Sequence, residues 1–124
     1  MSGLQVLVIQ PGDQPRAVRT TIEGNQLAAL QEAVGGYIEI QSFGPAGHLL
    51  FNEDGKARGL PVNRPASHVA RFAMDQPVPW LRPGEPLLGT VVVTGPADDD
   101  GELTDVRGAY QARIEGLGID VVDG

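Results

Sequence analysis

The chain has 124 residues, no cysteine and a formal net charge of -7 at pH 7. This length suits one hydrophobic core, so we expect residues 1–124 to form a single domain. Without cysteine, disulfides and thiolate metal sites are excluded, and a reducing cytoplasm is the compartment that fits. No apolar run reaches the roughly 18 residues of a membrane span.

The negative charge is concentrated in the second half of the chain. Residues 1–74 contain six acids and six bases, whereas residues 75–124 contain ten acids and three bases. Such a field repels phosphates, so we expect no direct binding of nucleic acid. It favours a basic partner surface, although acidic loops also serve solubility alone.

The first third of the chain predicts two strands and a helix. Residues 4–10 form an aliphatic run typical of a strand buried on both faces, and residues 16–22 form its expected antiparallel partner. Asn25 is a good N-cap for a helix that ends at Val34, where Gly35 accepts the left-handed conformation.

The middle third predicts strands at residues 37–43 and 48–51, a turn at 52–55 and a returning limb at 56–58. Pro65 then fits the first turn of a helix. Residues 75–86 are rich in proline and contain the single tryptophan, Trp80, so we expect an irregular packed loop there.

The last third predicts a strand, a loop, a helix and an edge strand. Residues 87–94 have the strongest strand composition and should lie centrally in the sheet. Residues 95–102 should form a mobile acidic loop. Thr104 suits the N-cap of a helix that ends near Gly116, and residues 119–122 suit a short edge strand.

Together these elements predict an α+β fold with a mixed, mainly antiparallel sheet of about five or six strands and two or three short helices, packed mostly on one side. The predicted core is aliphatic with few aromatic rings. Its members are Val6, Val8, Leu27, Leu30, Val34, Ile38, Ile40, Leu50, Leu60, Val69, Phe72, Val91, Val93, Val106, Tyr110 and Ile114.

The chain offers no recognisable catalytic or metal-binding pattern. Asp98 and Asp100 match a fragment of a calcium loop, but the first and twelfth ligand positions would be proline and arginine. His48 and His68 have no histidine or cysteine companion for zinc. No serine lies in a nucleophile elbow. We therefore predict no catalytic residue, no metal and no cofactor.

One polar bend is a candidate ligand site. Asn63 and Arg64 precede a helix start, where backbone N–H groups and a guanidinium can share an anion, and Asn52 is expected nearby. The same residues also suit a purely structural turn. The acidic loop is a candidate partner-binding surface, with Asp98, Asp99, Asp100 and Glu102 as the charged side chains.

Several segments, in order, resemble the uncharacterised family called domain of unknown function 3846. They are Val6 to Gly12, Leu27 to Glu39, Asn52 to Lys56, Gly59 to Arg64, and Gly89 to Gly95 with Leu103 to Asp105 beyond it. The resemblance covers roughly residues 4 to 115. The chain departs from the family pattern between Ser67 and Pro86, where a proline-rich stretch replaces an acidic, aliphatic one.

This resemblance implies an accessory protein of phages, plasmids or their bacterial hosts, acting in a bacterial cytoplasm. It implies no reaction. The leading hypothesis is a non-enzymatic protein that binds a host or phage protein, with the blunting of a defence system as one version. The alternatives are a small-ligand or nucleotide binder at Asn52, Asn63 and Arg64, an enzyme of unknown type, and a homo-oligomer.

Overall fold

The computed structural model describes residues 3–12, 14–42, 46–73, 80–82 and 84–124. Six strands and three helices are found among them. In chain order they are β1 (Leu4–Ile9), β2 (Arg16–Ile22), α1 (Gln26–Val34), β3 (Ile38–Ser42), β4 (His48–Asn52), α2 (Arg64–Phe72), β5 (Val91–Thr94), α3 (Gly108–Gly116) and β6 (Asp120–Asp123).

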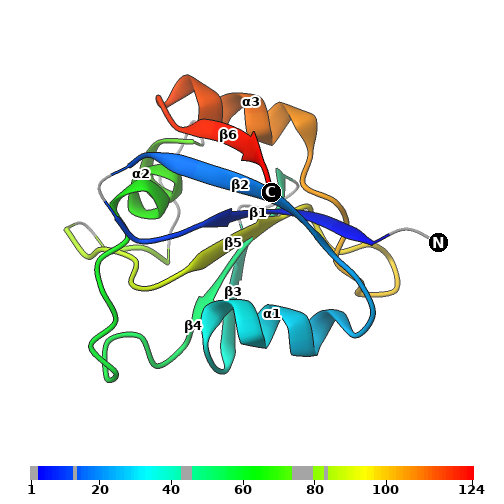
Figure 1. The fold of residues 1–124 in the computed structure, drawn as a ribbon, viewed down its shortest axis with the longest axis horizontal. Helices are drawn as coiled ribbons and strands as arrows, with labels where there is room; N and C mark the ends of the chain where they lie inside the picture. Colours follow the sequence, from blue (N-terminus) through cyan, green and yellow to red (C-terminus); the bar gives the residue numbers. More distant parts are fainter. Residues whose placement is uncertain (1–2, 13, 43–45, 74–79, 83) are drawn as a thin grey trace.

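The six strands form one mixed sheet in the order β3-β4-β5-β1-β2-β6 (Figure 1). Every neighbouring pair is antiparallel except β2 and β6, which run parallel. The predicted α+β class and mainly antiparallel sheet are therefore confirmed. The central position of β1 and β5 agrees with their long runs of β-branched and aliphatic residues.

Helices cover both faces of the sheet (Figure 1). Val69 of α2 and Ile114 of α3 pack with Leu7 and Val93 in the larger apolar cluster on one face. On the opposite face, α1 packs against β1, β4 and β5 in a second cluster. Two of the three helices thus share a face, as predicted. The α1 layer on the other face explains why β1 and β5 are buried on both sides.

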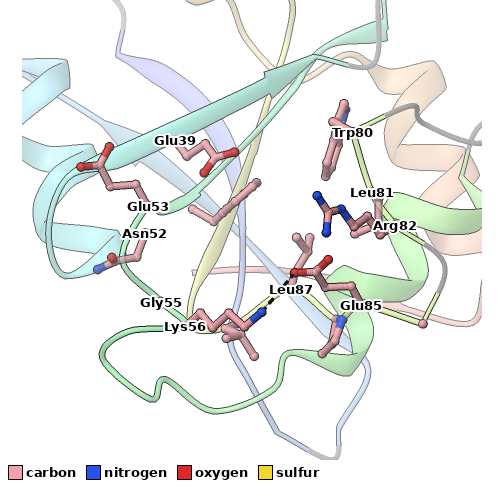
Figure 2. Close-up of a pocket in the computed structure, with 14 residues that line it drawn as sticks. Glu39, Asn52, Glu53, Gly55, Lys56, Trp80, Leu81, Arg82, Glu85 and Leu87 are labelled. Atoms are coloured by element: carbon pink, nitrogen blue, oxygen red, sulfur yellow. Dashed lines mark ion pairs between the residues drawn. The ribbon is translucent and has the colours of Figure 1, made fainter.

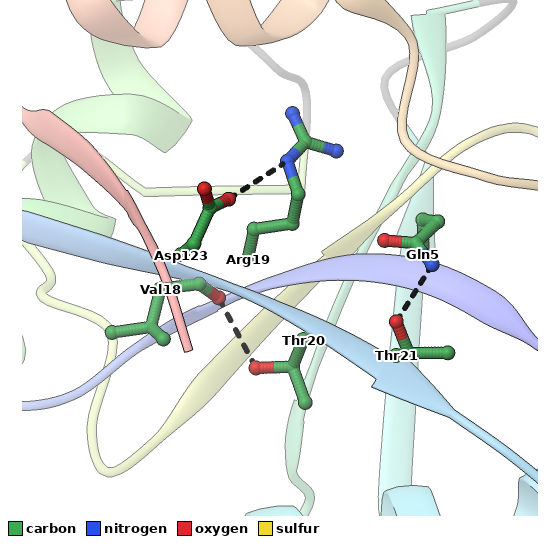
Figure 3. Close-up of polar contacts among 6 residues, drawn as sticks. All are labelled: Gln5, Val18, Arg19, Thr20, Thr21 and Asp123. Carbon is green, nitrogen blue, oxygen red and sulfur yellow. Dashed lines mark hydrogen bonds and ion pairs between the residues drawn. The ribbon is translucent and has the colours of Figure 1, made fainter.

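The C-terminal strand closes one side of the sheet. β6 pairs with β2, and Arg19 lies 4.0 Å from Asp123 across this pair in an exposed ion pair (Figure 3). In the same region, the Gln5 side chain of β1 donates to the Thr21 hydroxyl of β2 at 2.7 Å. The predicted edge strand near the C-terminus is confirmed.

The returning limb predicted at residues 56–58 is wrong. The backbone after β4 coils instead, with the Arg58 N–H donating to the Asp54 carbonyl at 2.8 Å and the Leu60 N–H donating to the Gly55 carbonyl at 2.9 Å. The reason is topological. β4 already lies between β3 and β5, so no edge of β4 is open to a hairpin partner.

Thr104 was predicted as the N-cap of the last helix, but α3 begins at Gly108 and its N-cap is Arg107. The Thr104 hydroxyl donates to the Pro96 carbonyl at 2.5 Å, and the Asp105 carboxylate accepts from the Gln5 N–H at 2.8 Å. The Val106 N–H donates to the Gln5 carbonyl at 2.9 Å. These residues are therefore held by β1 and by the loop before them rather than in a helical turn.

Three predicted core residues are exposed. Leu27, Ile40 and Phe72 expose 61%, 52% and 58% of their surface. Val8, Ile38 and Leu60 are only partly buried. The other predicted core residues are buried, namely Val6, Leu30, Val34, Leu50, Val69, Val91, Val93, Val106, Tyr110 and Ile114.

Two predicted boundaries need correction or fall outside the described residues. The strand predicted at residues 87–94 is shorter, since Gly89 has φ of 74° and its N–H donates to the Pro61 carbonyl at 2.7 Å. The end of the strand predicted at 37–43 lies outside the described residues, as does much of the loop predicted at 75–86. Among the described helices, none is long and apolar enough to cross a membrane.

Candidate functional site

Asn52 ends β4 with a buried side chain that bonds to backbone groups. Its amide nitrogen donates to the Val34 carbonyl at the end of α1, 3.1 Å away. Its amide oxygen accepts from the Asp54 N–H at 2.8 Å. Asn52 therefore joins α1 to the bend that follows β4, and only 4% of its surface is exposed.

Asn63 is fully buried and caps α2. Its amide nitrogen donates to the carbonyls of Ile9 and Gly89, each at 2.8 Å, and its amide oxygen accepts from the Ala66 N–H at 3.0 Å. An amide offers two N–H donors, and both are used here. The polar atoms of Asn63 are thus committed to the fold.

Arg64 is exposed, and no described residue bonds to its guanidinium. It borders a shallow hollow of about 230 Å³ together with Pro11 and Pro61. Asn52 instead lines a different cavity, and Asn63 lines neither. The structure therefore does not bring the three predicted ligand residues to one cavity, and Arg64 alone presents free donors to solvent.

The acidic residues 98–102 have unequal environments. The Asp98 carboxylate accepts from the N–H groups of Asp100 and Glu102, each at 2.9 Å, which shapes the turn. Asp99, Asp100 and Glu102 are exposed. Glu102 alone among these acids borders a groove on the α1 side of the sheet.

This groove, which we call the α1–β3 groove, has a volume of about 700 Å³. Leu27 of α1, Ile40 of β3 and Tyr37, which directly precedes β3, line it. They expose 61%, 52% and 68% of their surface, respectively. The buried Leu30 and Leu50 also contribute to its lining. Large apolar side chains that gather at one concave surface are typical of a protein-binding site.

The groove has an acidic rim. Glu53 and Glu102 are its charged lining residues, and none of its described lining residues is basic. Both carboxylates are exposed. Apolar groups bordered by carboxylates can accept a ligand surface that pairs apolar and basic side chains.

A second cavity, the Trp80 cleft, lies on the other face of β3 and has a volume of about 830 Å³. Figure 2 shows Glu39 of β3 and Trp80 of the facing loop at its two sides, with Lys56 and Glu85 paired at 4.0 Å. The Trp80 indole N–H donates to the Ser42 carbonyl at 3.0 Å.

Among the described residues, no three histidine or acidic side chains come together in a way that suits a metal ion. Burial lowers the pKa of His48 below its ordinary value, because the low-dielectric surroundings disfavour the imidazolium. Burial likewise raises the pKa of the Tyr110 phenol, and nearby Arg113 partly opposes this shift. Both residues lie in the sheet and its α3 layer rather than in either cavity.

The sequence interpretation missed the α1–β3 groove because it assigned Leu27 and Ile40 to the core. Helical spacing and strand alternation predict which side chains share a face, but they do not reveal where the opposing layer ends. Tyr37 was the one residue whose position in the sequence could have indicated an exposed apolar surface here. It directly follows the Gly35-Gly36 helix stop, where an aromatic residue has little core to enter.

The family model described as Domain of unknown function (DUF3846) matches residues 4–117. No curated protein and no solved structure matches the chain. The match spans both cavities, the smaller apolar cluster and all of the larger cluster except Ile119 and Val121. It agrees with the order of segments noted in the sequence. The chain belongs to the DUF3846 family.

Proposed function

We propose that this protein is a non-enzymatic binding module that docks another protein in the α1–β3 groove. The observation that carries the proposal is the exposure of Leu27, Tyr37 and Ile40 along one groove. Exposed apolar side chains gain free energy when a partner removes them from water. The family resemblance favours a host or phage protein as the partner.

The charge distribution supports the same proposal. Glu53 and Glu102 border the groove, and Glu102 belongs to the acidic segment predicted as a partner-binding surface. Acidic rims speed the approach of basic partners and select against acidic ones. The nucleotide-binding alternative stays a prediction that rests on Arg64, because the amides of Asn52 and Asn63 bond to backbone groups.

A matched pair of variants tests this function. Leu27→Ser and Phe72→Ser each remove a large exposed apolar side chain, but only Leu27 lies in the groove. Immobilised wild-type protein should capture a partner from bacterial lysate, the F72S variant should retain it, and the L27S variant should lose it. Equal capture by both variants, with folding checked by circular dichroism, would reject the groove as the docking site.

A further inference from the structure

β3 is an edge strand of the sheet, so only β4 pairs with its backbone. The pattern of hydrogen bonds to β4 determines which N–H and C=O groups of β3 point to the open side. Tyr37 lies opposite Glu53 in the antiparallel register, and the Glu53 N–H donates to the Tyr37 carbonyl at 3.0 Å. Bonded and non-bonded pairs alternate along such a ladder. The N–H and C=O groups of Ile38, Ile40 and Ser42 therefore point away from β4, toward the open edge.

Trp80 shows that an outward backbone group of β3 can accept a hydrogen bond from outside the sheet. Its indole N–H donates to the outward carbonyl of Ser42, which agrees with the alternation derived from Tyr37 and Glu53. No described residue bonds to the outward groups of Ile38 and Ile40. Unpaired edge groups of this kind form a template for an additional strand.

The two faces beside this edge differ in chemistry. Ile38 and Ile40 line the α1–β3 groove, where apolar side chains lie beside amide side chains and an acidic rim. Glu39 points to the other face and lines the Trp80 cleft (Figure 2). Successive side chains of a strand alternate between faces, so a strand added beside β3 would meet apolar groups and a carboxylate in turn.

The acidic side chains near this edge favour a basic partner segment over a second copy of this chain. In the Trp80 cleft Lys56 lies 4.0 Å from Glu85, and the other charged lining residues are Glu39, Glu53 and Arg82, so acids outnumber bases by three to two. A second copy of this chain would bring its own Glu39 to the same edge, and its net charge is also -7. Repulsion between two such edges disfavours self-pairing.

We propose that β3 accepts an extended segment of the partner protein as an added strand, and that this segment alternates apolar with basic residues. Its apolar side chains enter the α1–β3 groove, while its basic side chains lie beside Glu39. Backbone bonds to Ile38 and Ile40 supply affinity, and the alternation supplies specificity. This inference rests on the proposed function and names the chemistry of its partner.

The first test uses a capped seven-residue peptide that alternates lysine with isoleucine or valine. Binding is read from the fluorescence of Trp80, the single tryptophan of the chain. A peptide of the same composition with its lysines in one block should bind at least about tenfold more weakly, because it cannot present one chemistry to each face. Equal binding of the two peptides, or no binding of either, would overturn the proposal.

N-methylation identifies the backbone bonds. Alternate N–H groups of an added strand face β3, and the others face solvent. Methylating one alternate set should weaken binding by at least about tenfold, since several hydrogen bonds are lost, whereas methylating the other set should have little effect. Equal sensitivity of the two sets would show that no strand pairing occurs.

Variants of the chain supply the matching evidence. Ile40→Pro and Ile40→Thr both replace the large isoleucine side chain with a smaller one, but only proline also removes the outward N–H. Edge strands tolerate proline. The I40P variant should bind the alternating peptide more weakly than the I40T variant. Glu39→Lys should reverse the preference toward a peptide that alternates glutamate with isoleucine, while Glu32→Lys, on an exposed residue outside both cavities, should not.

These outcomes separate the inference from the proposed function. Partner capture that is lost in the L27S variant but equal in the I40P and I40T variants would leave the groove as a docking site and reject strand addition. A concentration-dependent dimer in light scattering that the alternating peptide cannot dissociate would assign the edge to a second copy and overturn the proposal.

Discussion

The side-chain amide of Asn63 donates a hydrogen bond at 2.8 Å to the carbonyl oxygen of Ile9, 54 residues earlier in the chain. A second bond of the same length reaches Gly89, just before β5. One buried side chain thus ties the start of α2 to the ends of the two central strands. This explains why the polar bend between β4 and α2 holds a fixed position beside the sheet.

Replacing Asn63 should therefore be costly. Asn63→Ala leaves two carbonyls and the Ala66 N–H without their partner in a buried site, so we expect the free energy of unfolding to fall by about 2–4 kcal/mol. Urea unfolding measures this loss. Asn25→Ala removes the exposed cap of α1, which has one side-chain bond at 3.2 Å, and should cost about 1 kcal/mol or less. Equal losses would contradict the role assigned to Asn63.

Gly95 marks the closest backbone approach after β5. A Cβ there would overlap the Asp105 carbonyl and lie 2.7 Å from the Thr104 hydroxyl oxygen. We expect Gly95→Ala to lower the free energy of unfolding by about 2–3 kcal/mol. At Gly116, on α3, nothing lies within 4 Å of an added Cβ. Gly116→Ala should instead raise the free energy of unfolding by about 0.5 kcal/mol through helix propensity. Thermal melts measure both effects, and equal melting temperatures of the two variants would contradict the prediction.

Two aspartates of the acidic loop separate the effect of hydrogen bonding on stability from the effect of charge. Asp98→Ala removes an acceptor of two backbone N–H groups and should destabilise the protein by about 1 kcal/mol. Asp99→Ala removes an equal charge from an exposed side chain and should leave the denaturation midpoint unchanged. If Asp99→Ala proved as destabilising as Asp98→Ala, the turn would depend on charge rather than on hydrogen bonding.

Stability should also depend on pH through His48. Burial lowers its pKa in the folded protein, so the unfolded chain binds the proton more readily. The free energy of unfolding should therefore fall as the pH drops through the ordinary histidine range. Urea midpoints at pH 7.5 and 5.5 measure this, and His48→Gln should show a smaller difference than wild type. Identical differences would mean that another group causes the pH dependence.

The elements with local signals could be predicted from the sequence. The side chain of Asn25 accepts the Ala28 N–H, and Gly35 adopts φ of 80°, so both ends of α1 follow rules of local chemistry. The pairing of β1 with β2 follows from a short turn between two strand-like runs. These features depend on neighbours in the chain.

The parts that could not be predicted depend on distant contacts. Asn52 and Asn63 resemble exposed turn residues in the sequence, yet their partners include Val34 and Ile9, which no local pattern reveals. The start of α3 was misplaced because Asp105 pairs with Gln5, 100 residues earlier. The groove was missed for a related reason, since Ile40 has a strand pattern but lies on the outermost strand.

The opposite end of the sheet behaves differently from β3. β6 is four residues long, and Asp120 and Asp123 stand at its two ends, a combination that discourages further pairing. A segment taken up at β3 would thus find no equivalent acceptor on the far border of the same molecule. Strand addition at β3 is therefore expected to give a one-to-one complex rather than a growing fibre.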